Sequence, residues 1–386
     1  MTSKIVVNNI ESDTGTPSVT INSDLTASSN ITASSNITAS GNITSSGLTV
    51  GQNVYPAAGP LSNRNKIING AMVIDQRNSG ASGTAVGYTV DRWRYFASQA
   101  SKGTWEQNAA SVTPPVGFNY YLGYTSSSSY TLLSTDLFGI AQTIEGYNIS
   151  DLEYGTSNAK PITISFWIRS SLTGLFGGFL KNGGASGGGN NTRFCPFSYT
   201  INSANTWEYK TITINGDTAG SWESTNGPAF SVAFSLGNGS NYVGGTSGTW
   251  SGTEYLQPPG CVNIVETNGA TLYVTGVQLE VGTVATPFEH RSYGQELALC
   301  QRYYHRLKGG TLFPPVTFST TQRRSNFSFP VTMRATPTVS NLNVSFISSP
   351  IASATQDGVS IAGNASSDIE CSLNIDLNSN TLSAEL

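Results

Sequence analysis

The chain has 386 residues and a net charge of −4, and only 11% of its residues are charged. A chain of this length exceeds what one hydrophobic core usually supports, so we expect two or more folded units. The scarcity of charge argues against long amphipathic helices and favours many short strands joined by polar turns. Because acidic residues outnumber basic ones, nucleic acid and anionic membrane surfaces are poor partners, whereas a neutral glycan fits.

The N-terminal sequence, MTSKIVVNNIESD, lacks an apolar run of signal-peptide length, and no stretch of about 18 apolar residues occurs anywhere in the chain. We therefore expect synthesis in a cytoplasm and no membrane insertion. The four cysteines, which lie far apart without a CxxC pair, are Cys195, Cys261, Cys300 and Cys371. This spacing favours buried free thiols over a disulfide scaffold or a zinc site.

A six-residue repeat follows the N-terminal segment and reads LTASSN, ITASSN, ITASGN. Each unit pairs an apolar residue with threonine, which favours extended backbone, and ends in residues that favour a corner. One apolar residue in six cannot form a core within a single chain, so we expect three chains to wind together as an intertwined β stalk. A disordered Ser/Thr-rich linker is the alternative. The expected core residues of the trimer stalk are Val19, Leu25, Ile31, Ile37 and Ile43.

Between residues 65 and 291, short stretches alternate between apolar and polar residues, as is typical of half-buried strands. In PITISFWIRSS, residues 161–171, Phe166 and Trp167 therefore face opposite sides of a strand. In residues 271–281 the alternation slips by one position at Gly276, which predicts a β-bulge there. Strands this short and numerous predict an all-β fold, with a jelly-roll β-sandwich over residues 65–291.

An extended segment, followed by ITISFWIRSS and then by WEYKTITING, resembles carbohydrate-binding jelly-roll modules. The resemblance implies that sugar rings stack on aromatic side chains that lie in or beside loops. For each such residue, packing in the core is the alternative. The candidate glycan-contact residues are Trp93, Trp105, Tyr120, Tyr121, Trp222, Trp250 and Tyr255.

Residues 292–306 are expected to form one connecting helix. Ser292 and Gln295 have the spacing of a capping box, in which each side chain bonds to the backbone N–H of the other residue. We expect the helix to pack where the central domain meets the next one, or at the trimer axis. Beyond it, residues 307–386 alternate again and predict a small C-terminal antiparallel β domain. The residues that share the apolar face of the helix are Tyr293, Leu297, Cys300 and Tyr304.

Two longer blocks bracket the central domain: NKIINGAMVIDQRNSG with YTVDRW (65–93), and VTGVQLEVGTVATPFEHRSYGQELALCQRYY (274–304). They closely resemble sequences that recur in tail-fibre and receptor-binding proteins of phages, especially marine ones, and MRATPTV (333–339) resembles those proteins too. The resemblance implies a homotrimeric virion component, a tail fibre that mediates host attachment through a host-surface glycan. Residues 1–18 would then attach to a phage tail or adaptor protein, and residues 19–64 would be stalk and linker.

Catalytic motifs are scarce in the sequence. His290 and His305 are the only histidines, and no phosphate-binding glycine loop follows a strand, so we expect no enzyme, no cofactor and no metal site. Four acidic residues leave two alternatives open, a glycan depolymerase of the tailspike type and a structural Ca²⁺ site. A capsid-anchored decoration fibre without a receptor role is a further alternative. The four acidic residues are Asp136, Glu145, Asp151 and Glu153.

Overall fold

The computed structural model describes residues 48–50, 53–55, 62–184, 189–306, 311–312, 316–317, 322–337 and 339–375. The expected attachment segment, residues 1–18, lies outside these ranges. The expected stalk-core residues also lie outside them: Val19, Leu25, Ile31, Ile37 and Ile43. The intertwined stalk therefore stays a prediction. Within the described part of the chain, no helix is long and apolar enough to cross a membrane.

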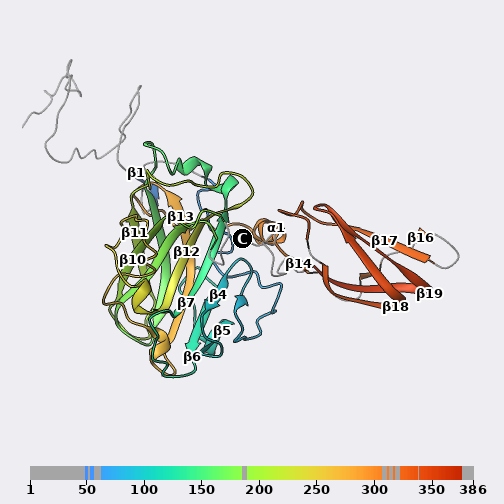
Figure 1. Cartoon of the computed structure of the whole chain (residues 1–386), viewed down its shortest axis with the longest axis horizontal. Coiled ribbons are helices and arrows are strands. Elements are labelled where there is room, and N and C mark those ends of the chain that lie inside the picture. Colours follow the sequence, from blue (N-terminus) through green and yellow to red (C-terminus); the bar gives the residue numbers. More distant parts are fainter. Residues whose placement is uncertain are drawn as a thin grey trace, which may run out of the picture. The chain divides into compact units, whose positions relative to one another are not determined.

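The central domain is a sandwich of two antiparallel sheets, and the predicted jelly-roll architecture is confirmed (Figure 1). The six-stranded sheet has the order β10-β9-β12-β7-β4-β3, and the five-stranded sheet has the order β11-β8-β13-β6-β5. The strands of the first sheet are β3 (Gly87–Tyr88), β4 (Arg94–Ala97), β7 (Leu137–Glu145), β9 (Gly174–Asn182), β10 (Phe194–Ile201) and β12 (Pro228–Asn238). The strands of the second are β5 (Gly103–Gln107), β6 (Leu122–Ser126), β8 (Ile162–Ser170), β11 (Glu208–Ile214) and β13 (Thr271–Val281).

The hydrophobic core lies between the two sheets, because alternate residues of each strand point inward. Phe166 of β8 and Phe234 of β12 are fully buried, and their ring centroids lie 4.9 Å apart. Trp167, the next residue of β8, is only half-buried, on the outer face of the five-stranded sheet. The alternation predicted for β8 is therefore confirmed, with Phe166 in the core and Trp167 on the outer face of the sheet.

The predicted β-bulge in β13 is also present. The pairing of β13 with β8 shifts between Thr275 and Gln278, and Gly276 has φ of +61°. A backbone of this kind is strained for residues with a Cβ, which accounts for glycine at this point. The bulge keeps Leu272 and Leu279 on the same inner face although the alternation slips between them.

Helix α1 (Tyr293–Gln301) begins at the predicted capping box, with Ser292 accepting from the Gln295 N–H. The helix ends earlier than residue 306, because the Arg302 carbonyl accepts a hydrogen bond from the Arg334 N–H and residues His305–Arg306 form strand β14. Of the predicted apolar stripe, Cys300 is buried, whereas Tyr293 is 63% exposed.

The loops and the chain ends carry short elements. Before the sandwich, β1 (Leu48–Val50) pairs with β2 (Asn53–Tyr55). The 3-10 helices are η1 (Ala109–Ser111), η2 (Gly146–Asn148), η3 (Ser150–Leu152), η4 (Ser240–Tyr242) and η5 (Ile264–Glu266).

The C-terminal region is an antiparallel sheet, in which β17, β18 and β19 lie side by side (Figure 1). Its strands are β14 (His305–Arg306), β15 (Thr311–Leu312), β16 (Val316–Thr317), β17 (Gln322–Ser328), β18 (Val339–Ala354) and β19 (Gly358–Ile375). Strand β19 is continuous over its 18 residues. Its middle remains in the sheet because Asn364 and Ala365 pair with Ser348 and Ile347.

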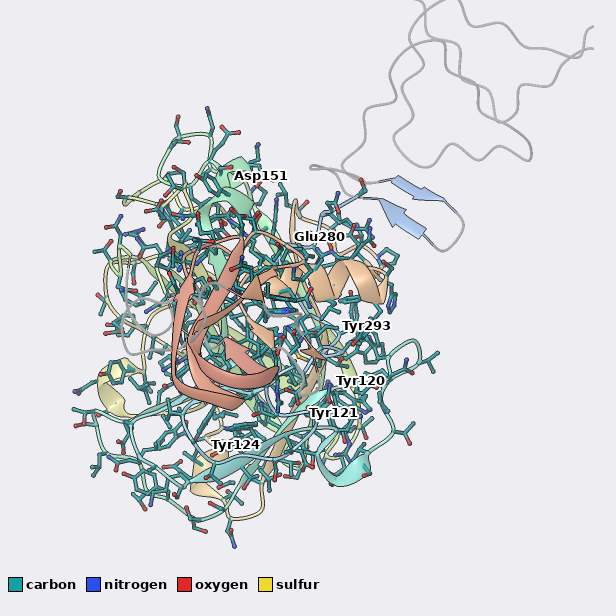
Figure 2. The ribbon with its side chains drawn as sticks, turned by 90° about the vertical axis from the view of Figure 1, so that its right-hand side faces the viewer. Tyr120, Tyr121, Tyr124, Asp151, Glu280 and Tyr293 are labelled. Carbon is teal, nitrogen blue, oxygen red and sulfur yellow. The ribbon has the colours of Figure 1, made fainter. Side chains whose placement is uncertain are left out.

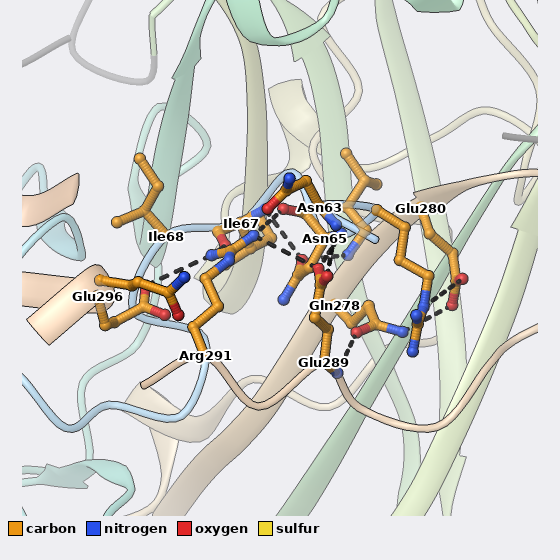
Figure 3. A network of polar contacts seen from close by, with 12 residues as sticks. Asn63, Asn65, Ile67, Ile68, Gln278, Glu280, Glu289, Arg291 and Glu296 are labelled. Atoms are coloured by element: carbon orange, nitrogen blue, oxygen red, sulfur yellow. Dashed lines mark hydrogen bonds and ion pairs between the residues drawn. The ribbon is translucent and has the colours of Figure 1, made fainter. Parts of the chain in front are cut away.

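The two sequence blocks that bracket the sandwich meet in one polar network (Figure 3). Glu289 accepts hydrogen bonds from the backbone N–H groups of Asn63 and Asn65, at 2.5 and 2.9 Å. Arg291 donates to the carbonyls of Ile67 and Asn65. The network closes the sandwich, since it ties the segment that enters it to the segment that leaves it.

Candidate functional site

Three of the candidate glycan-contact residues are buried. Trp93 is fully buried, and its indole N–H donates to the Asn69 carbonyl at 3.0 Å. Trp105 is 7% exposed and donates to the Ala85 carbonyl at 2.9 Å. Tyr121 is fully buried, and its hydroxyl accepts from the Val112 N–H. Their rings pack within the protein, so these three side chains do not present a face to a ligand.

Two further candidates, Trp222 and Trp250, are half-buried and stand almost perpendicular, with ring centroids 5.3 Å apart. Both contact the buried ring of Tyr154, at 4.8 and 5.8 Å between centroids. Their indole N–H groups donate to the carbonyls of Ala219 and Asn215. Each indole is thus held by loop backbone, and the pair closes one end of the core.

The remaining two candidates are half-buried as well. Tyr120 precedes β6 next to Tyr121 (Figure 2), and its ring packs on the main core. Tyr255 lies against the backbone of Gly244 and Gly245, where a Cβ added to Gly244 would come within 2.3 Å of the tyrosine ring. The structure does not bring the seven predicted residues together on one surface.

The four acidic residues considered for catalysis or Ca²⁺ binding are engaged separately. Glu145 is buried and pairs with Arg302, and Asp136 accepts from Ser98 and Tyr130. The other two form exposed ion pairs, Asp151 with Lys66 at 2.7 Å and Glu153 with Lys160 at 2.7 Å. In the described residues, no group of three or more His, Cys, Asp or Glu side chains could hold a metal ion.

The cysteines have the environment of structural residues. Cys195 and Cys300 are buried and Cys261 is half-buried, and all three are free thiols. Burial raises the pKa of Cys195 to about 12 and that of Cys261 to about 11, so both stay protonated at neutral pH. The side chain of Cys371 lies outside the described residues.

Aromatic side chains do gather on the outer face of the five-stranded sheet. Trp167 of β8 and Tyr209 of β11 occupy directly paired positions, with ring centroids 5.4 Å apart and an interplanar angle of 49°. Tyr209 is 44% exposed, and Trp167 is half-buried. Cross-strand neighbours on one face lie about 5 Å apart, so the pairing of β8 with β11 alone creates this two-ring platform.

Three more rings extend this platform across β13. Phe118 and Phe288 are half-buried, with centroids 5.1 Å apart, and the exposed ring of His290 lies 5.3 and 4.9 Å from them. Gly276 lies between the two groups of rings. A Cβ added there would come within 2.7 Å of Phe118 and 3.2 Å of Trp167. We call the five residues Phe118, Trp167, Tyr209, Phe288 and His290 the aromatic face.

Polar groups flank the aromatic face. Thr211, two residues after Tyr209 and on the same side of β11, is exposed. Arg169, on the same side of β8 as Trp167, is half-buried, and its Nε donates to the Asn205 carbonyl at 3.1 Å. Exposed apolar rings beside hydroxyl and guanidinium groups are suited to an amphipathic ring with one C–H face and a rim of hydroxyls.

The alternation places Trp167 on the outer side of its strand, but Trp167 is not among the predicted candidates. Those candidates lie in or beside glycine-rich loops, whereas Trp167 and Tyr209 lie on strands. Tyr209 alternates with Thr211 and Thr213 in WEYKTITI, and this alternation was a usable signal. For Phe118 and Phe288 the sequence contains no such signal, because only the fold brings their loops close to Gly276.

No protein-family model matches the chain, and the comparison with curated proteins finds no relative. Among solved structures, a putative sugar-binding protein of Bacteroides thetaiotaomicron is similar at 10% identity, over 56% of this chain and 100% of that one, with a TM-score of 0.33. The family 11 carbohydrate-binding module of a Clostridium thermocellum cellulase matches at 12%, over 55% and 98%, with a TM-score of 0.28. The enzymatically active domain of tailspike protein 4 of bacteriophage CBA120 matches at 12%, over 59% of this chain and only 24% of that one, with a TM-score of 0.32.

Proposed function

We propose that the protein binds a glycan on the aromatic face. The observation that carries the proposal is the pair of Trp167 and Tyr209, two accessible rings 5.4 Å apart on a rigid sheet. A pyranose ring is about as long as this spacing, and its axial C–H groups can lie on an aromatic ring. Stacking of this kind needs no charge, in agreement with a chain that is only 11% charged.

The platform is also preorganised. Both residues lie within paired strands, so their backbones are fixed before a ligand arrives, and little conformational entropy is lost on binding. Stacking at each single platform is weak, but the overall affinity would rise when several copies bind one repeating polysaccharide at the same time.

The biological setting that we propose is a phage virion. The blocks at 65–93 and 274–304 resemble phage fibre proteins, and the six-residue repeat favours a homotrimer. In this setting the N-terminal segment attaches to a tail or adaptor protein, and the sandwich presents three aromatic faces to the host surface. The role is host attachment.

We also propose that the protein binds without cutting. Glu145 is neutralised by Arg302, and the carboxylates of Asp151 and Glu153 are held by lysines. A glycosidase of the usual kind needs two carboxyl groups on either side of one glycosidic bond. Incubation with polysaccharide should therefore release no new reducing ends, and their appearance would support a depolymerase instead.

The binding proposal is tested with an array of immobilised polysaccharides, comprising bacterial lipopolysaccharides, capsular polysaccharides and neutral glucans. We expect the full chain to retain at least one of them, and Trp167→Ala to lose that signal. Trp222→Ala serves as the matched control, because Trp222 is a half-buried tryptophan outside the aromatic face. Equal retention of the wild type and both variants would exclude the aromatic face as the binding site. No retention of the wild type would exclude binding of the glycan classes on the array.

A further inference from the structure

Helix α1 carries an apolar side chain that the rest of the described chain leaves uncovered. Tyr293, in its first turn, is 63% exposed and lies at the surface (Figure 2). It begins the stripe that continues with Leu297 and Cys300, which pack against Ile68 and Ile74. Tyr293 thus lies on the packing side of the helix, but no described residue of its own chain covers its ring.

A pocket lies beside the same helix. Its volume is about 760 Å³, and helix residues Gln295, Ala298 and Leu299 line it together with Ser62 and Val331. An α-helix turns by about 100° per residue, so these three helix positions are rotated by about 140° to 240° from Tyr293. The exposed tyrosine and the pocket therefore lie on opposite sides of α1.

The charged groups around the pocket are already paired. Arg302 forms an ion pair with Glu145, and Arg291 lies 3.5 Å from Glu296 and 3.7 Å from Glu289. A further ion is therefore a poor occupant. Alanine, leucine and valine walls suit an aromatic ring, and Gln295 and Thr332 at the lining can bond to its hydroxyl.

A side chain on one side of a helix and a complementary pocket on the other make a heterologous contact possible. In such a contact each copy provides a knob to one neighbour and receives a knob from another, and the arrangement closes into a ring when the rotation between copies is a whole fraction of a turn. A homotrimer with cyclic symmetry needs this type of contact. Ser62, which lines the pocket, lies at the end of the expected stalk-and-linker segment (residues 19–64), so a shared stalk brings the pocket-bearing regions of the copies together.

We infer that α1 is the contact between protomers, with Tyr293 of one copy seated in the pocket formed by Ala298, Leu299 and Val331 of the next copy. The partner is a second copy of this chain. The inference rests on the proposed homotrimer and deepens it, because it assigns the contact that holds the globular parts together. Of the aromatic face, only His290 also lines this pocket, so the rings of Phe118, Trp167, Tyr209 and Phe288 stay available for glycan.

The test places a photo-crosslinking residue at the knob of the full-length chain, as Tyr293→p-benzoylphenylalanine. Illumination should join protomers, and peptide mass spectrometry should find the new bond in residues 289–302 or 331–332 of the neighbour. Tyr147→p-benzoylphenylalanine is the matched control, since Tyr147 is 62% exposed and lies in η2. The control should give no crosslink to those peptides.

A second variant, Ala298→Trp, fills the pocket from within and should abolish the crosslink from position 293. Light scattering on the wild-type chain tests the homotrimer separately from the α1 contact. A monomeric mass near 40.7 kDa would refute the homotrimer itself. A trimeric mass without any crosslink from position 293 to those peptides would refute the α1 contact while the homotrimer stands.

Discussion

Asn65 and Glu289 lie 224 positions apart in the chain, yet the backbone N–H of Asn65 donates to Oε2 of Glu289 at 2.9 Å. The same carboxylate accepts from the Asn63 N–H at 2.5 Å, so one side chain holds the entry segment at two points (Figure 3). The two blocks that resemble phage fibre proteins thus help to close the sandwich, whereas three of the five residues of the aromatic face, Phe118, Trp167 and Tyr209, lie outside them.

We predict that Glu289→Ala lowers the free energy of unfolding by about 3 kcal/mol. The substitution removes two hydrogen bonds to a charged acceptor, each worth about 1.5–3 kcal/mol. Urea unfolding followed by tryptophan fluorescence measures the change. Glu266→Ala is the control, because Glu266 is exposed and should shift stability by no more than about 0.5 kcal/mol. Equal effects of the two substitutions would contradict a closing role for Glu289.

The ion pair of Arg302 and Glu145 gives a second prediction. Glu145 is 1% exposed and receives two hydrogen bonds from Arg302 and one from the Tyr303 hydroxyl. Arg302→Ala leaves a buried carboxylate without its cation, so we expect a loss of about 3 kcal/mol. Lys160→Ala breaks the exposed pair with Glu153 and should cost less than about 1 kcal/mol. Thermal unfolding of both variants would show whether burial makes this difference.

The sequence allowed the fold to be predicted in more detail than the site. Strands β8 and β13, the bulge at Gly276 and the capping box of α1 all follow from local patterns, because alternation and turn chemistry act over a few residues. The pairing of β8 with β11 is not local. It creates the contact of Trp167 with Tyr209, so the platform could not be assembled from periodicity alone.

Two loop tryptophans were predicted as ligand contacts but belong to the core. Trp93 and Trp105 stand next to glycine-rich or polar segments, where exposure was expected, yet both are buried with their indole N–H groups bonded to backbone carbonyls. A large ring with one polar group is as well suited to pinning a loop onto the core as to binding a ligand. The neighbouring sequence does not distinguish the two uses.

Gly276 provides a third prediction, which distinguishes the destabilisation caused by backbone strain from that caused by contact with the aromatic rings. Gly276→Ala should be destabilising for two reasons, its φ of +61° and the collision of a Cβ with Phe118 and Trp167. Gly260→Ala shares only the first, because Gly260 has φ of +81° and no atom lies within 4 Å of the added Cβ. We expect about 1–2 kcal/mol for Gly260→Ala and clearly more for Gly276→Ala. Denaturant midpoints that agree would show that the rings do not close over Gly276.

His305 provides a prediction about pH. It is 7% exposed, stacks on Phe327 at 5.7 Å, and neither ring nitrogen has a hydrogen-bond partner among the described residues. Burial lowers its pKa from the ordinary 6.5 to about 4. Between these values the unfolded chain binds a proton that the folded chain does not. Stability is therefore complete above pH 6.5 and falls by about 1.4 kcal/mol per pH unit as pH decreases toward 4.

The variant His305→Phe isolates this effect from the titration of carboxylates. Chemical unfolding of wild type and variant, measured at intervals from pH 7 to pH 4, should show the wild type losing stability relative to the variant as pH falls, by about 1.4 kcal/mol per pH unit, because only the wild type has a histidine to protonate on unfolding. Parallel curves over this range would show that His305 is not held neutral in the folded protein.

Glycan binding on the aromatic face is tested most directly by titration calorimetry with the polysaccharide that the array identifies. Two double variants are compared with the wild type, Trp167→Ala with Tyr209→Ala, and Trp222→Ala with Trp250→Ala. Stacking of a nucleic-acid base on an aromatic ring contributes about 1–3 kcal/mol. If a sugar ring gains as much from each ring of the platform, removing both should weaken binding at least about 30-fold. The loop pair should keep wild-type affinity. Unchanged affinity in the platform variant, or an equal loss in both variants, would contradict the assignment of this face.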